Sequence, residues 1–419
     1  MSPIPPRGRV LPRLATVLTA GLALLVASAP AGAAADVSPD VAAQDAAAFV
    51  ARTLTEYGHH YVYPDTDGTL STDGYLDGGN TLDAVLALDG AHTAGDEADR
   101  AMAFLESHLG DYVGAGPDTT YAGSTAKALL TVVAHGGDPR SVGGSDLVAR
   151  LEATEGAVDP GRFSDLPSTG CGQKQCDYSN TIGQSLALLA LERAGRPVDD
   201  PARAFLLDQQ CPDGGFRATP GGRRCASDPD ATAFAAQALL ALGATDAAQD
   251  ALDHLEDAQG ADGGLSAADG DPNANTTAVA VQAFTAGGRT SPADAGRAFL
   301  LGLRYGCSAP EALVGAVAHS AAERSSTEPA DSDLRATPQA TLALAGGSLL
   351  SVSAQDASRA APASSCTAAA SASPAAQADE DGADGSGSSA LPVWVAVGVA
   401  LALLAVLGGW LARRRSGER

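Results

Sequence analysis

The sequence predicts an all-α fold: an (α/α)6 toroid of six helical hairpins, followed by one C-terminal transmembrane helix. The main observation is an internal repeat. Residues 202–216, ARAFLLDQQCPDGGF, align with residues 251–265, ALDHLEDAQGADGGL, at a constant offset of 49. Amphipathic helices alternate with helices that are apolar on almost all sides, and the latter pattern is typical of buried helices. Exposed and buried helices in alternation predict two concentric rings; an open superhelical solenoid is the structural alternative.

Each predicted hairpin has an outer helix, a turn and an inner helix. Copies of the more charged outer helix begin within 47–54, 101–109, 147–153, 202–216, 251–265 and 296–303. The apolar inner helix is expected at 80–88, 124–133, 180–191, 230–242, 275–284 and 335–344. Every inner helix carries a threonine at an equivalent place: Thr81, Thr125, Thr181, Thr232, Thr277 and Thr337.

The ends of the chain predict export and anchoring. Residues 1–35 have arginines before an apolar run and then small residues, which is typical of a secretory signal peptide. The toroid domain is expected at 36–350, followed by an acidic Ala/Ser/Pro/Gly stalk at 351–389 that is predicted to be disordered. Residues 390–412 are uncharged and long enough to cross a bilayer, and 413–419 form a basic tail. This arrangement predicts a single-pass type I protein in the cell membrane, with its toroid domain outside the cell.

The net charge narrows the classes of possible partner, and the cysteine content predicts disulfides. Fifty acidic and 26 basic residues give a formal charge of −24, so nucleic acid and anionic membrane surfaces are poor partners, and the membrane is reached through the anchor alone. Six cysteines in an exported chain predict three disulfides. Proximity in the sequence favours Cys171–Cys176 and Cys211–Cys225, which leaves Cys307 with Cys366, although six cysteines allow fifteen connectivities.

The candidate ligand-binding residues lie where the inner helices begin. Parallel inner helices gather their N-termini at one rim, where free N–H groups attract polar acceptors. Each such residue alone is expected to be a helix cap, but together they predict an acceptor-rich bowl. The candidates are Asp77, Asn80, Asp177, Tyr178, Asn180, Asp228, Asp230, Asn275 and Asp333.

The Gln-x-x-Asp-Gly-Gly-Phe turn and the Asp-x-Thr helix starts resemble the prenyltransferase and squalene-oxidase repeat superfamily over roughly residues 40–350. That resemblance implies the α/α toroid of terpene cyclases, protein prenyltransferases, complement thioester domains, and transcobalamin with intrinsic factor. Transcobalamin and intrinsic factor fit best in character, because they are extracellular, disulfide-bonded and non-catalytic. Their second, lid-forming domain has no counterpart here, so a lid would come from a separate protein.

The sequence motifs for several reactions known in this superfamily are incomplete in this chain. Asp228-Pro229-Asp230-Ala231 lacks the last acid of the Asp-x-Asp-Asp motif of cyclases, and both tryptophans lie in the predicted anchor. Protein prenylation would need a zinc site, and no histidine pairs with a cysteine at ligand spacing. The segment at 170–176, GCGQKQC, has Lys174 where a thioester needs glutamine. Cleavage of glycans would need two carboxylates, which are abundant, and stacking aromatics, which are few.

The sequence therefore predicts a cell-surface protein that binds a small molecule, with a corrinoid-like nutrient as the candidate ligand and a membrane transporter as the partner. No catalytic residue, metal or cofactor is expected. Two alternatives stay open: an extracytoplasmic toroid enzyme, either terpene cyclase-like or polysaccharide-acting, and a non-catalytic scaffold for protein interactions.

Overall fold

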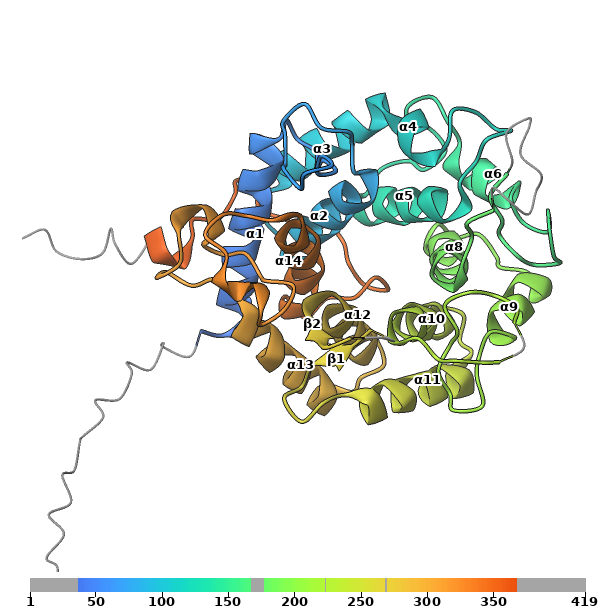
Figure 1. Cartoon of the computed structure of the whole chain (residues 1–419). Coiled ribbons are helices and arrows are strands. Elements are labelled where there is room, and N and C mark those ends of the chain that lie inside the picture. Colours follow the sequence, from blue (N-terminus) through green and yellow to red (C-terminus); the bar gives the residue numbers. More distant parts are fainter. Residues whose placement is uncertain (1–36, 167–176, 223, 268–269, 368–419) are drawn as a thin grey trace, which may run out of the picture. The chain divides into compact units, whose positions relative to one another are not determined.

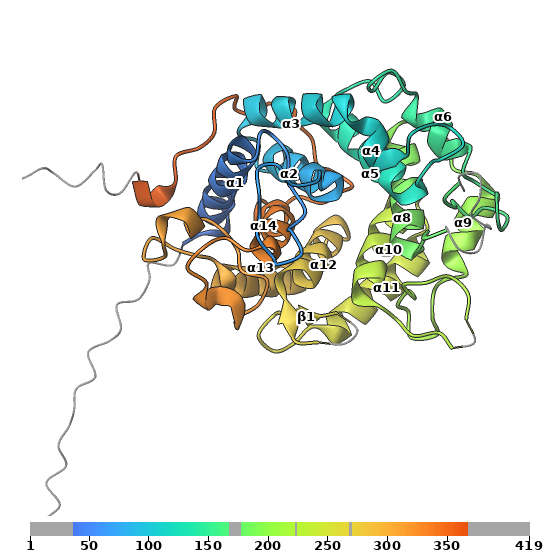
Figure 2. The ribbon, with the colours of Figure 1, turned by 45° about the horizontal axis from the view of Figure 1, so that its top comes forward.

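The computed structural model describes residues 37–166, 177–222, 224–267 and 270–367, which all belong to one compact unit. Figure 1 shows this unit as an inner ring of helices surrounded by outer helices, and Figure 2 shows the same two layers from another side. The inner helices are α2 (Gly78–Gly90), α5 (Ala122–His135), α8 (Thr181–Arg193), α10 (Pro229–Ala241), α12 (Ala274–Ala286) and α14 (Asp331–Leu344). The outer helices are α1 (Pro39–Glu56), α3 (Gly95–Ser107), α4 (Leu109–Val113), α6 (Leu147–Glu152), α9 (Asp200–Leu207), α11 (Thr245–Ala258) and α13 (Thr290–Leu303).

Little else in the described residues is regular. Strands β1 (Leu265–Ser266) and β2 (Pro272–Asn273) form an antiparallel pair with Leu265 opposite Asn273. Two short 3-10 turns, Glu311–Leu313 and Glu323–Ser325, lie between α13 and α14.

The inner ring is closed. Each inner helix packs against the next one along the chain, and α14 packs against α2. This last contact confirms the toroid and rules out the open solenoid. It also places α2 directly across the ring from α10.

The repeated threonines explain why the hairpins are alike. The backbone N–H of Phe216 donates to Thr232 Oγ1 at 2.8 Å, and the N–H of Leu265 donates to Thr277 Oγ1 at 2.9 Å. Tyr61 with Thr81 and Val317 with Thr337 repeat this bond at 2.9 and 3.0 Å. A buried threonine hydroxyl therefore ties each of these inner helices to the turn before it. In the third hairpin the equivalent bond is made by Gln184, whose Oε1 accepts from Phe163 N–H at 3.0 Å.

Two glycines allow α5 and α8 to approach closely. A Cβ atom on Gly123 would lie 3.5 Å from the Cα of Gly183, and a Cβ on Gly183 would lie 3.3 Å from the Cα of Gly123. Larger residues at either position would push these helices apart and widen the ring on that side.

The chain after α14 does not leave the toroid at residue 350. Residues 345–367, here called the C-terminal strap, continue along the unit. Ser358 N–H donates to His92 O at 2.9 Å, and Ser365 N–H donates to Asp45 Oδ1 at 2.6 Å. A disulfide joins Cys366 to Cys307. The stalk boundary expected after residue 350 therefore lies too early, because residues 351–367 are hydrogen-bonded to the ring.

Two of the expected disulfides, Cys211–Cys225 and Cys307–Cys366, are present. The third, Cys171–Cys176, lies outside the described residues, as do the signal peptide at 1–35, the remaining stalk at 368–389, the anchor at 390–412 and the tail at 413–419. Within the ranges that are described, no helix has both the length and the apolar character needed to span a membrane.

Candidate functional site

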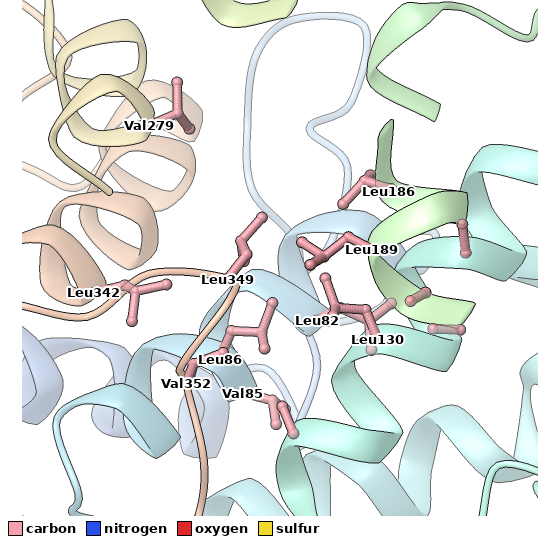
Figure 3. Close-up of a cluster of buried hydrophobic side chains, with 14 of the residues drawn as sticks. Leu82, Val85, Leu86, Leu130, Leu186, Leu189, Val279, Leu342, Leu349 and Val352 are labelled. Atoms are coloured by element: carbon pink, nitrogen blue, oxygen red, sulfur yellow. The ribbon is translucent and has the colours of Figure 1, made fainter. Parts of the chain in front are cut away.

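The inner ring encloses a central cavity of about 420 Å³. Its apolar lining includes Leu86, Leu130, Leu186, Val279, Leu342 and Leu349, and Figure 3 labels these among the buried hydrophobic side chains. Polar side chains also line it, and Ser124, Asn180, Asp230 and Asn275 lie at or near the N-termini of inner helices. The polar lining residues are Asp83, Tyr112, Ser124, Lys127, Asn180, Asp230, Asn275, Gln282 and Gln339.

The C-terminal strap forms the floor of this cavity. Leu349 lies on the strap and points toward the cluster of leucines in Figure 3. Its N–H donates to the buried Gln237 Oε1 at 2.9 Å, and its carbonyl accepts from Arg193 Nη1 at 2.8 Å. Arg193 also donates to Val352 O at 2.6 Å. Because Arg193 ends α8, the strap lies at the C-terminal end of the ring, opposite the N-terminal rim.

Asp230 is the most unusual side chain of the cavity. It lies in the first turn of α10, and its Oδ1 is buried with no hydrogen-bond partner among the described residues. Burial raises the pKa of this carboxyl, and the neighbouring charge of Asp228 raises it further, while the Thr276 hydroxyl and His319 act in the opposite direction. Such an environment favours the neutral acid, which can donate a proton.

A second carboxyl faces Asp230 from across the ring. Asp83 lies on α2, and its Oδ1 forms an ion pair with Lys127 Nζ of α5 at 2.8 Å. Both side chains are mostly buried, with 12% and 19% of their surface exposed. The cavity therefore holds one carboxyl with a raised pKa and one carboxylate paired with an ammonium group.

Asn275 organises the wall between these two acids. Its Nδ2 donates to Arg335 O at 3.0 Å and to Gln339 Oε1 at 2.9 Å. Its Oδ1 must then accept the remaining bond, 2.9 Å from His319 Nδ1. His319 Nδ1 is therefore the donor in this bond.

Three of the nine residues predicted to bind ligand line this cavity: Asn180, Asp230 and Asn275. Asp77, Asn180 and Asp228 cap α2, α8 and α10 by accepting a backbone N–H, as expected for each residue alone. Asn80 Nδ2 donates to Asp77 Oδ2 at 2.8 Å, and Asp177 pairs with Arg162 at 2.8 Å. These contacts hold the rim in shape.

The two other candidates lie in opposite environments. Asp333 is 1% exposed, and its Oδ2 accepts the Ala330 N–H at 2.9 Å. Burial raises the pKa of Asp333 to about 6. Tyr178, in contrast, is 78% exposed at the rim.

Sequence reasoning missed Asp83, Lys127, Gln339 and His319. The first three share one register, two residues after the repeated threonines Thr81, Thr125 and Thr337. That register places a side chain on the inner face of its helix, so the repeat itself contained the signal. His319 lies in an irregular segment between α13 and α14, where no periodic pattern marks it.

Metal binding has no visible support in the part of the chain described here. No group of three or more His, Cys, Asp or Glu side chains is placed so that it could hold a metal ion.

Comparison with known proteins identifies the class of fold. No protein-family model and no curated protein matches the chain in sequence. Unsaturated glucuronyl hydrolase from Bacillus sp. GL1, which degrades glycosaminoglycan, is similar in structure with a TM-score of 0.51 and 14% identity, over 73% of this chain and 96% of that chain.

Two further solved structures are more distant. A wild-type glycosidase has a TM-score of 0.48 and 15% identity, over 76% of this chain and 99% of that chain. The ent-copalyl diphosphate synthase from Streptomyces platensis has a TM-score of 0.40 and 22% identity, over 64% of this chain and 50% of that chain. The comparisons support an α/α toroid and give no support to the narrower resemblance to transcobalamin and intrinsic factor.

Proposed function

We propose that this chain is an extracytoplasmic α/α toroid enzyme that cleaves a glycosidic bond in its central cavity, with Asp230 as the general acid. The observation that carries the proposal is the Asp230 carboxyl, which lines the cavity with a buried, unpartnered oxygen and a raised pKa. Paired acids whose surroundings favour opposite protonation states are the usual basis of acid–base catalysis at neutral pH. The two disulfides suit an oxidising compartment.

In the proposed reaction Asp230 gives its proton to the oxygen of the leaving sugar as the glycosidic bond breaks. Asp83, on the opposite wall, accepts a proton from a water molecule, whose oxygen bonds to the anomeric carbon. Proton transfer from Asp83 back to Asp230 through solvent restores the starting state. Attack by this water, with no covalent bond between the sugar and the protein, would invert the configuration at the anomeric carbon.

The lining favours a carbohydrate over an isoprenoid. Ser124, Asn180, Asn275 and Gln339 place hydroxyl and amide groups in the cavity, where sugar hydroxyls can bond to them. The aromatic side chains that line the cavity, Tyr112 and Phe234, are few for a reaction through carbocations, which aromatic faces stabilise. The leucine floor then contacts the apolar C–H face of a sugar ring.

The test is a comparison of two asparagine variants two residues apart. Asp230→Asn should lower the release of reducing sugar about 10²- to 10⁴-fold, because it removes the proton donor. Asp228→Asn is the control for the helix start, since asparagine caps a helix as well as aspartate does; it should lower turnover far less than Asp230→Asn, because the Asp228 charge only adds to the raised pKa of Asp230. The assay uses the wild-type protein with laminarin, glucomannan, xyloglucan and hyaluronan, together with aryl glycosides. Equal rates for Asp230→Asn and wild type would contradict the proposal.

If the protein captures a ligand without catalysis, the glycosidase proposal would have to be replaced by that of a binding protein. A thermal shift with cobalamin and no turnover of any glycan by the wild-type protein would favour the binding protein. The cavity of about 420 Å³ lies in the lower part of the range of ligand pockets, about 300–1,000 Å³. A corrinoid would therefore bind at the rim, where a lid protein or transporter could contact it.

A further inference from the structure

We propose that four tyrosines at the N-terminal rim, Tyr63, Tyr75, Tyr121 and Tyr178, form a binding surface for an extended neutral glycan. We call this set the tyrosine arc. The inference rests on the proposed function, because it describes how a chain that is cut in the cavity would be held outside it.

The tyrosines of the arc are unusually exposed for large aromatic side chains. Tyr75 and Tyr178 are 86% and 78% exposed, and Tyr63 and Tyr121 are 47% and 41% exposed. The chain has eight tyrosines in all, so half of them lie on the surface at one rim. Large aromatic rings usually contribute buried area, and Tyr75 and Tyr178 contribute little of it.

The arc follows the starts of three neighbouring inner helices. Tyr75 precedes the N-cap of α2, Tyr121 is the N-cap residue of α5, and Tyr178 precedes the N-cap of α8. Tyr63 lies beside Tyr75, because its N–H donates to Tyr75 O at 2.8 Å. The ring order α2, α5, α8 places these tyrosines in sequence along the side of the mouth that leads into the cavity.

Buried bonds fix the backbone that presents the arc. The Asp165 carboxylate accepts the N–H of Ala122 at 2.8 Å and the N–H of Tyr178 at 3.0 Å, so it joins the starts of α5 and α8. At the other end, the Arg335 guanidinium lies 5.8 Å from the centre of the Tyr63 ring and is paired with Asp77 at 3.4 Å. The side chains are exposed, but their positions are set by the fold.

The chemistry of the surroundings identifies the ligand class. Asp77 and Asp177 lie beside the arc, and the arginines next to it, Arg335 and Arg162, are paired with these two acids. Both acids are almost fully buried, so their pairing leaves these arginines with no free cation for an anionic polymer. A neutral glycan can stack its apolar C–H faces on the rings without a charged partner.

The test measures glycan binding apart from catalysis. Retardation of the protein in native gels that contain laminarin, glucomannan or xyloglucan reports binding of the chain. We expect the wild type to be retarded by at least one of these glycans and the Tyr75→Ala/Tyr178→Ala double variant to lose about 10-fold or more of its affinity. Hyaluronan, which is anionic, should retard neither protein. Both rings are so exposed that the double variant should unfold at the wild-type temperature.

Controls separate this inference from the proposed function. Asp230→Asn should bind as the wild type does while losing turnover, and Val41→Ala, at a 42% exposed position of α1, should change neither. In an active protein, the double variant should raise the KM for long chains and leave that for a short aryl glycoside unchanged. No retardation of the wild type by any neutral glycan, or equal retardation of the double variant, would overturn the tyrosine arc even if turnover is found.

Discussion

Asp228 and Asp230 are two residues apart on the same helix start and have different surroundings. The Asp228 side chain accepts the Ala231 N–H at 2.8 Å, so it caps a backbone N–H at the start of α10. Asp230 is turned into the cavity, where its Oδ1 has no partner in the described chain. The sequence predicts the cap at Asp228 because the residue type and position suffice. It cannot predict the environment of Asp230, since that environment is made by Thr276 and His319 on distant segments.

Asp333 provides a test of burial at the residue scale. Burial raises the pKa of this carboxyl to about 6, against about 3.9 in an unfolded chain. The folded state thus holds the proton more tightly, and this contribution to stability is complete below about pH 3.9 and is lost as the pH rises through about 6. Asp333→Asn should therefore gain stability relative to wild type between pH 4.5 and pH 8.

Urea denaturation at several pH values measures this difference in the free energy of unfolding. The exposed Asp257→Asn on α11 is the control and should show no trend with pH. A constant difference between wild type and Asp333→Asn across this range would show that the Asp333 carboxyl is not perturbed by burial.

At the scale of the element, the inner helix with its threonine is the repeating unit. Thr232 is fully buried, and its hydroxyl accepts from Phe216 N–H and donates to Asp228 O at 2.7 Å. Thr232→Val keeps the shape and leaves the Phe216 N–H without a partner, which should lower the free energy of unfolding by about 1–3 kcal/mol. Thr245→Val, at an exposed position that begins α11, is the control and should change it by less than about 0.5 kcal/mol.

Chemical denaturation of these two variants decides whether the threonines stabilise the hairpins. Equal stability of Thr232→Val and wild type would mean that the repeated threonine reflects packing of its methyl group alone.

The positions of the inner helices were the part of the fold that the sequence predicted best. The inner helices lie where the repeat places them, because an apolar helix followed by a turn at fixed spacing has few other ways to bury its surface. Their starts were less exact: α14 begins at Asp331, although the repeat predicted a helix from 335. The C-terminal strap was missed altogether. Its composition is that of a linker, and it is held by partners such as Asp45 and Arg193 that are far away in the sequence.

At the scale of the whole molecule, the strap and the ring together define the site. Contact between α14 and α2 closes the ring, and Leu349 on the strap forms part of the floor of the central cavity. Sequence alone predicted the rim but not the cavity wall. The register of Asp83 and Lys127 in the repeat indicates the inner face, but the ion pair that joins these two residues depends on how α2 and α5 pack.

The central claim is that the cavity raises the pKa of Asp230 and so favours its protonated form, and titration of this carboxyl tests the claim most directly. Carbon-13 NMR of protein labelled at the aspartate carboxyl carbons can follow every aspartate, and the signal that Asp230→Asn removes identifies Asp230. We predict a midpoint clearly above the ordinary value near 3.9, in keeping with the direction given by burial. A midpoint at or below 3.9 would contradict the account, because the cavity would then not favour the protonated form of Asp230.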